Sequence, residues 1–232
     1  MAAVQEPGTP ILGPARATVE QAQAWARSRG ATEQFVALAP LYWRLGPERG
    51  GVEPAGAYSQ AAKEMAFGRF GGVVDPSFCN PCGLKTRQGG SNSDPNAHQR
   101  FASWEKGVIA HLDHLALYAG APGYPRPDTP DPRHFPFLLG KARTYEELGG
   151  KWAPSPDYGR SIVRDYLQPL LATAEAAPEP PPASDAGTLD AYRRALADLE
   201  AAHERLLAEH RRVAGELQAA LDKLARIREI VA

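Results

Sequence analysis

The chain has 232 residues, of which 26 are basic and 27 are acidic, so its formal net charge is -1. This length suits one main domain with an appendage, and the balanced charge argues against a general nucleic-acid or anionic-membrane surface. No stretch has the roughly 18 consecutive apolar residues of a membrane span, and the first residues lack a signal-peptide pattern, so we expect synthesis in the cytoplasm and no stable membrane insertion.

The first part of the chain predicts an irregular arm followed by helices. Residues 1–17 contain prolines and glycines without periodicity, which is typical of irregular structure. Thr18 is a suitable N-cap for a helix that stops at Gly30. A second helix is predicted from about Thr32, and a third from Pro54, since proline suits the first helical turn. These helices should form a compact lobe.

The middle of the chain alternates between loop and helix. Residues 71–101 are dense in Gly, Pro, Asn, Asp and Ser, and their brief apolar pieces predict a short hairpin in a long, functional loop. A helix is predicted from an N-cap at Ser103 to Gly120. A proline-rich excursion follows, and a last helix runs from about Pro156 to Leu171. We therefore place the main domain at residues 18–172.

The C-terminal segment has a different composition. Residues 173–187 are rich in Ala and Pro and predict a semi-extended linker. Residues 188–232 carry apolar side chains at heptad spacing, which predicts a coiled-coil helix and a homo-oligomer; a helix that folds back on the main domain is the alternative. The predicted a and d positions are Leu189, Tyr192, Leu196, Leu199, His203, Leu206, His210, Val213, Leu217, Ala220, Leu224, Ile227 and Val231.

One acidic residue interrupts the otherwise apolar stretch AYSQAAKEMAFGRFGG at residues 57–72. Because a carboxylate packs poorly, Glu64 needs a cation, water or a chemical role. Apolar neighbours raise the pKa of a carboxyl group, and a raised pKa suits a general acid near neutral pH. Taken alone, the pattern favours a solvated surface glutamate paired with a lysine or arginine.

An ordered set of motifs accompanies Glu64. Four segments follow one another between residues 57 and 163, within a resemblance that covers about residues 18–170: AYSQAAKEMAFGRF, NPCGLK, HQRFASWEKGVIAHLDHL and WAPSPDYGRSIV. Together they resemble the glucosaminidase domain of bacterial cell-wall hydrolases, glycoside hydrolase family seventy-three. The chain departs from the family pattern where Ala66 replaces a glycine, Cys82 an aromatic residue and Trp152 a tyrosine.

The resemblance implies a mainly α (α+β), lysozyme-like helical domain with a small β-lobe beside a sugar cleft. The heptad spacing adds the coiled-coil helix after it. The implied reaction is hydrolysis of the β-1,4 bond after N-acetylglucosamine in peptidoglycan, with Glu64 as general acid and without metal or cofactor. Tyr158 would orient the sugar or stabilise the transition state. The implied substrate-binding residues are Gln60, Phe67, Asn80, Lys85 and Trp152.

The second catalytic group stays open at this level. A direct inverting route needs a carboxylate roughly 6.5–9.5 Å from the acid. Asp94 is the favoured candidate, and Asp75 is the other. If the N-acetyl group of the substrate acts as nucleophile, no second carboxylate is required.

Other sites and functions were weighed against this interpretation. His111, Asp113 and His114 share one predicted helix, but a metal site there needs ligands from other segments. Cys79 and Cys82 are two ligands short of a structural zinc site, which leaves a local disulfide or two packed thiols. The alternative function is a non-catalytic cell-wall-binding or scaffolding protein assembled by its coiled coil. In either case the protein acts at the bacterial cell wall, after lysis or phage-assisted release.

Overall fold

A computed structural model describes residues 8–174, 211–213, 215 and 217. The chain divides into two compact units, residues 1–176 and 177–232. The first unit is mainly helical, as predicted. Its helices are α1 (Val19–Ser28), α2 (Glu33–Val36), α3 (Ala39–Glu48), α4 (Pro54–Glu64), α5 (Trp104–Ala119), α6 (Tyr158–Ile162) and α7 (Gln168–Leu171), with the short 3₁₀ helices η1 (Pro76–Phe78), η2 (Pro95–Ala97), η3 (Pro136–Leu138) and η4 (Glu146–Leu148) and the π-helical η5 (Val163–Leu167).

The helix ends agree with the local signals in the sequence. The Thr18 and Ser103 side chains accept hydrogen bonds from the first turns of α1 and α5, and Gly120 ends α5 in the left-handed conformation. The predicted second helix is two helices, α2 and α3, since the chain turns at 37–38 between them. The predicted last helix is α6, η5 and α7 in succession.

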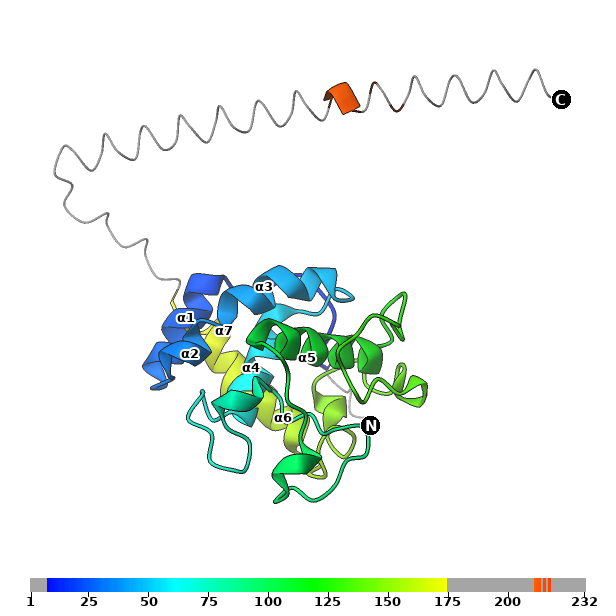
Figure 1. Cartoon of the computed structure of the whole chain (residues 1–232). Coiled ribbons are helices and arrows are strands. Elements are labelled where there is room, and N and C mark those ends of the chain that lie inside the picture. Colours follow the sequence, from blue (N-terminus) through cyan, green and yellow to red (C-terminus); the bar gives the residue numbers. More distant parts are fainter. Residues whose placement is uncertain (1–7, 175–210, 214, 216, 218–232) are drawn as a thin grey trace, which may run out of the picture. The chain divides into compact units, whose positions relative to one another are not determined.

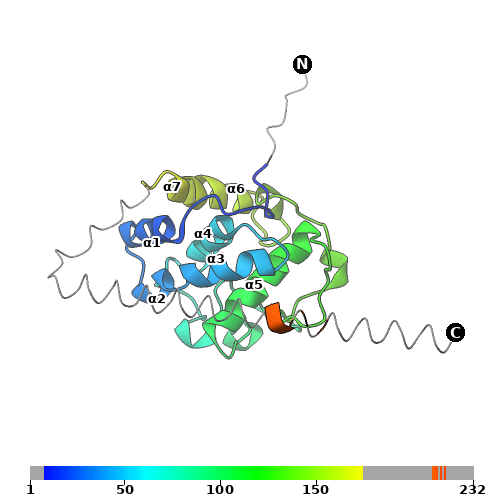
Figure 2. The ribbon, with the colours of Figure 1, turned by 90° about the horizontal axis from the view of Figure 1, so that it is seen from above.

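Helix α4 lies at the centre of the first unit (Figures 1 and 2). It contacts α3, α5, α6 and η5, and every residue from Pro54 to Ala62 is buried. Five of its eleven residues are Ala or Gly, which allows neighbouring helices to approach closely on all sides. A helix surrounded in this way belongs to the core rather than to the surface.

The N-terminus of α4 is held by a buried carboxylate. Glu53 is only 2% exposed, and its oxygens accept hydrogen bonds from the backbone N–H groups of Ala55 (3.0 Å) and Gly56 (2.8 Å). Arg16 adds a guanidinium contact at 2.8 Å and a backbone contact at 3.1 Å. The carboxylate thus caps α4 and fixes the N-terminal arm to it.

The predicted β-lobe is wrong in its secondary structure. Within the described residues, 71–101 form no strand; Lys85 and His98 make an isolated antiparallel bridge. The segment is built from η1 and η2, each beginning at a proline and capped by an aspartate, Asp75 or Asp94. Proline cannot donate to a sheet ladder, and the Asp caps favour tight turns instead.

The C-terminal unit is described at residues 211–213, 215 and 217, which are helical. Val213 and Leu217, at predicted d and a positions, are 49% and 61% exposed. The rest of the predicted linker and coiled coil lies outside the described residues, so oligomerisation through 188–232 stays a prediction. None of the described helices is long and apolar enough to span a membrane.

Removal of the α4 cap should destabilise the first unit strongly. We expect Glu53→Ala to lower the free energy of unfolding by about 3–5 kcal/mol, because it leaves a partly buried arginine and two helix N–H groups unpaired. Urea unfolding followed by circular dichroism measures this change. Glu105→Ala is the control, since Glu105 pairs with Arg44 on the surface and should unfold like the wild type. Equal midpoints for all three proteins would contradict the anchoring role of Glu53.

Candidate functional site

Glu64 is the last residue of α4, and the chain turns sharply after it. Ala66 and Phe67 have positive φ angles of 46° and 59°, followed by Gly68 at 83°. This left-handed turn ends the helix and returns the chain toward α2, where the Thr32 N–H donates to the carbonyl of Phe67 at 3.0 Å. The helix therefore does not continue past Glu64.

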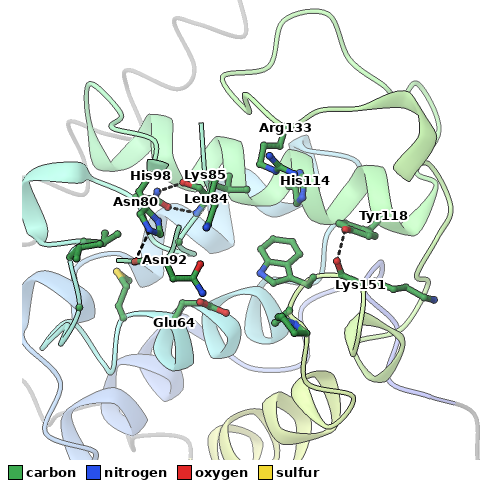
Figure 3. A pocket seen from close by; sticks show the side chains of 18 of the residues that line it. Glu64, Asn80, Leu84, Lys85, Asn92, His98, His114, Tyr118, Arg133 and Lys151 are labelled. Carbon is green, nitrogen blue, oxygen red and sulfur yellow. Dashed lines mark hydrogen bonds between the residues drawn. The ribbon is translucent and has the colours of Figure 1, made fainter. Parts of the chain in front are cut away.

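A cleft of about 650 Å³ lies against this helix end, within the range typical of ligand sites. Its wall includes Glu64, the 70–74 and 83–85 segments, and residues from α5 and the 133–138 and 151–154 loops. Figure 3 shows Glu64 on one side of the cleft and His114 and Arg133 on the other. Three distant parts of the chain therefore meet around one acid.

Glu64 is paired directly with Tyr158. The Tyr158 hydroxyl, at the start of α6, donates a hydrogen bond to Oε1 of Glu64. Burial raises the pKa of Glu64, and this outweighs the lowering effects of the Tyr158 hydrogen bond and the Lys63 charge. A carboxyl group with a raised pKa can hold and release a proton near neutral pH.

A glycine allows Tyr158 to reach this position. A Cβ on Gly159 would lie 1.8 Å from the carbonyl oxygen of Tyr145, so no larger residue fits where α6 passes η4. Gln60, one turn before Glu64 in α4, donates from Nε2 to the Tyr158 hydroxyl at 2.9 Å. Gln60 is fully buried and is not part of the cleft wall. The predicted substrate-binding role is therefore replaced by support of Tyr158.

Asn80 and Lys85 are both in the cleft wall, as the motif order suggested. The Asn80 side chain holds the turn that carries Lys85: its Nδ2 donates to the carbonyl oxygens of Leu84 (2.8 Å) and Gln99 (3.0 Å), and its Oδ1 accepts from the Leu84 N–H (3.0 Å). Lys85 donates to the carbonyl of Gly90 across the same loop. Asn80 thus stabilises the turn that forms this part of the cleft wall.

Trp152 also lines the cleft, where it packs edge-on against His114 at 4.9 Å between ring centroids. His114 in turn contacts the buried Asp131 at 2.7 Å through Nδ1, and His134 contacts the same carboxylate at 3.2 Å. Burial alone would raise the pKa of Asp131, but His114 and His134 lower it to about 2. Asp131 is therefore ionised and fixes the ring that supports Trp152.

Three further residues predicted as site candidates do not line the cleft. Asp94 is exposed and caps η2 through the Asn96 N–H at 2.9 Å; Asp75 is likewise an exposed cap of η1. Phe67 is 8% exposed and packs against Trp25 in the core. Its positive φ turns it inward, which periodicity alone does not indicate.

The cleft also contains residues that motif reasoning missed. Phe135 and Phe137 stack on each other at 5.4 Å and 11°, and Phe137 is 68% exposed. Both lie in the proline-rich excursion, whose HFPF sequence was the available signal. The charged and imidazole groups of the wall are one acid, Glu64, and the basic side chains of Lys85, His98, His114, Arg133 and Lys151.

The metal and disulfide alternatives receive no support from the geometry. No group of three or more Cys, His, Asp or Glu side chains in the described part of the chain is arranged to hold a metal. His111 and His114 have separate partners, Gln60 and Asp131. Cys79 and Cys82 are both free thiols.

Comparison with known proteins gives one distant relative. No family model and no solved structure matches this chain. An uncharacterized protein of Borreliella burgdorferi (strain ATCC 35210 / DSM 4680 / CIP 102532 / B31) is 28% identical over 114 residues, which are 49% of this chain. The chain thus covers about half of that relative, 53% of its length.

The left-handed turn after Glu64 contains a residue that glycine should improve. Ala66 has a φ of 46°, which costs an L-residue roughly 1–2 kcal/mol. We expect Ala66→Gly to raise the free energy of unfolding by about 0.5–1 kcal/mol, measured by urea unfolding, after the entropy cost of glycine. Ala24→Gly in the regular helix α1 is the control and should destabilise by about 1 kcal/mol. Destabilisation by both substitutions would contradict a strained turn.

Loss of the Tyr158 hydroxyl should change the titration of Glu64. Tyr158→Phe removes a hydrogen bond that favours the carboxylate, so the pKa of Glu64 should rise further. The measurement is ¹³C NMR of labelled glutamate side chains across pH, with the Glu64 signal assigned by its absence in Glu64→Gln. Tyr166→Phe removes a nearby hydroxyl that is not hydrogen-bonded to Glu64 and should leave the titration unchanged. An unchanged Glu64 titration in Tyr158→Phe would show that the contact is not formed in solution.

Proposed function

We propose that this protein is a peptidoglycan hydrolase that cleaves the β-1,4 bond after N-acetylglucosamine, with Glu64 as general acid. The observation that carries the proposal is the Glu64–Tyr158 pair: a carboxyl group with a raised pKa, at the end of a buried helix, in the wall of a cleft. The motif order around Glu64 and Tyr158 supports the family resemblance. A lysozyme-like arrangement of the helical domain is part of this proposal.

The remaining wall of the cleft suits a charged glycan. Exposed aromatic rings such as Phe137 provide apolar faces on which sugar rings stack. Lys85, Arg133 and Lys151 add positive charge, which is complementary to the carboxylates that muramic acid and its peptide carry. A neutral polysaccharide would not use these cations.

We further propose that the substrate's own acetamido group is the nucleophile. Among the residues that the structure describes, Glu64 is the one acid lining the cleft, and neither Asp94 nor Asp75 is in its wall. In this route Glu64 gives its proton to the glycosidic oxygen, the C1–O bond breaks, and the acetamido oxygen bonds to C1. Water then attacks C1 and breaks the new bond between C1 and the acetamido oxygen, while the Glu64 carboxylate takes a proton from that water. The configuration at C1 is retained overall.

The reaction is tested on purified peptidoglycan by mass spectrometry of the borohydride-reduced products. Wild type should release fragments that end in reduced N-acetylglucosamine, and a folded Glu64→Gln should be slower by about 10²–10⁴-fold. Asp94→Asn, the matched acid-to-amide control, should keep its rate.

Three outcomes would change the proposal. Equal rates for wild type and Glu64→Gln would remove the general-acid role. Inactivation by Asp94→Asn would favour the inverting route through that carboxylate. No release from any wall type, together with sedimentation of the protein on walls, would favour a non-catalytic binding protein.

A further inference from the structure

A buried chain of hydrogen bonds leads from the core to Glu64. The Tyr42 hydroxyl (α3) is 2.8 Å from Nδ1 of His111 (α5), and His111 Nε2 is 3.1 Å from Oε1 of Gln60. Gln60 Nε2 is 2.9 Å from the Tyr158 hydroxyl, which meets Glu64. The first three side chains, Tyr42, His111 and Gln60, are fully buried. Buried polar groups without access to water are held by such partners.

The first half of this chain has one favourable direction. His111 is the one hydrogen-bond partner of the Tyr42 hydroxyl within the described residues. Because an unpaired buried proton is costly, Tyr42 donates to Nδ1. Burial and the neighbouring His114 lower the pKa of His111 to about 3, so the ring is neutral near pH 7 and has one N–H. That N–H is on Nε2, and it is donated to Gln60.

The direction of the His111–Gln60 hydrogen bond also determines the direction of the bonds from Gln60 to Tyr158 and from Tyr158 to Glu64. Since Oε1 of Gln60 accepts from His111, its amide nitrogen faces Tyr158 and donates to the hydroxyl oxygen. The Tyr158 hydroxyl has one proton to donate, and its oxygen already accepts a hydrogen bond from Gln60. The Tyr158 proton is therefore directed to Oε1 of Glu64.

We propose that Tyr42, His111 and Gln60 are positioning residues. Their hydrogen bonds all run in the same direction, and this keeps the Tyr158 hydroxyl donating its hydrogen bond to Oε1 of Glu64. When Glu64 is protonated, its own proton must then be on Oε2. A Cβ on the cleft-lining Gly83 would lie 3.5 Å from Oε2, which places that oxygen beside the cleft wall. The chain thus presents the acidic proton to the substrate, and this consequence rests on the proposed function.

Reversed hydrogen bonds along this chain would prevent Glu64 from acting as the general acid. If Tyr158 donated to Gln60 instead, the Glu64 proton would be drawn to Oε1 and toward Tyr158, away from the cleft. After proton transfer to a substrate, the carboxylate would also lack the donor that stabilises it. A fixed direction therefore serves both the protonated and the ionised acid.

Other titratable groups also face the two ends of the chain. Lys63, Cys82 and Tyr166 act electrostatically on or with Glu64, and His114 and Asp131 act on His111. A substitution at position 111 removes none of these side chains, and two substitutions at that position that differ in donor capacity share any indirect effect on them. A difference in Glu64 titration between two such substitutions therefore reports the chain itself.

An isosteric pair of variants tests the chain. His111→Gln keeps an amide N–H that can donate to Gln60, whereas His111→Met has a similar shape and no donor. We expect the Met variant to raise the pKa of Glu64 by ¹³C NMR, to shift the basic limb of the kcat profile upward, and to lower kcat by about tenfold or more. The Gln variant should retain the wild-type pKa and kcat within about threefold.

A second pair covers the case in which His111→Met does not fold. Tyr42→Phe frees the His111 tautomer and should raise the pKa of Glu64 in the same direction by less. Its control, Tyr58→Phe, also deletes a buried hydroxyl, one that donates to the Phe35 carbonyl at 3.1 Å, and should leave the Glu64 titration unchanged.

The readouts separate this inference from the proposed function. A wild-type Glu64 titration in folded His111→Met, or in Tyr42→Phe, would overturn the positioning role. Equal shifts in the Met and Gln variants would also overturn it, since only one lacks the donor. The NMR titration needs no activity, so a shift in a protein that cleaves no wall would uphold the chain and reject the hydrolase.

Discussion

Helix α4 is buried on all sides from Pro54 to Ala62, and this burial dictates how the other helices of the first unit are arranged. A helix with so little solvent contact must find protein partners for most of its polar groups; the buried Ser59 hydroxyl is the exception among its described side chains. Glu53 meets this requirement at the N-terminus by accepting two helix N–H bonds and binding Arg16. Gln60 meets it in the interior through His111 and Tyr158. The partners recruited in this way come from the N-terminal arm, α5 and α6, so one buried helix organises the whole unit.

The same constraint explains why the acid lies where it does. Glu64 is at the first point where α4 reaches a cleft, and the left-handed turn at Ala66 and Phe67 prevents the helix from continuing over it. The apolar surroundings that the helix needs for packing also disfavour the ionised carboxyl group. Core packing and acid chemistry are therefore the result of one arrangement, in which Tyr158 opposes part of the effect of burial.

Local structure was largely predictable from the sequence. The N-caps at Thr18 and Ser103, the proline start of α4 and the glycine end of α5 are signals within a few residues of each other, and the helices follow them. The short hairpin expected in 71–101 does not form, because the Asp-Pro turns of η1 and η2 outweigh the brief apolar pieces between them. Of the predicted site residues, Glu64, Asn80, Lys85 and Trp152 line one cleft and Tyr158 contacts Glu64, whereas Gln60, Phe67 and Asp94 are not in the cleft wall.

Local signals in the sequence specify several helix ends, including the starts of α1, α4 and α5 and the end of α5, because caps, prolines and glycines act on the backbone nearby. The sequence also places the acid and tyrosine in a recognisable order along the chain. Sequence spacing does not reveal that His111 faces Gln60 while His114, one turn on, faces Asp131 and the cleft; the packing of the folded chain sets this. Those roles depend on which segment covers each side of α5, and the partners come from elsewhere in the chain: Gln60 is 51 positions from His111, and Asp131 is 17 positions from His114.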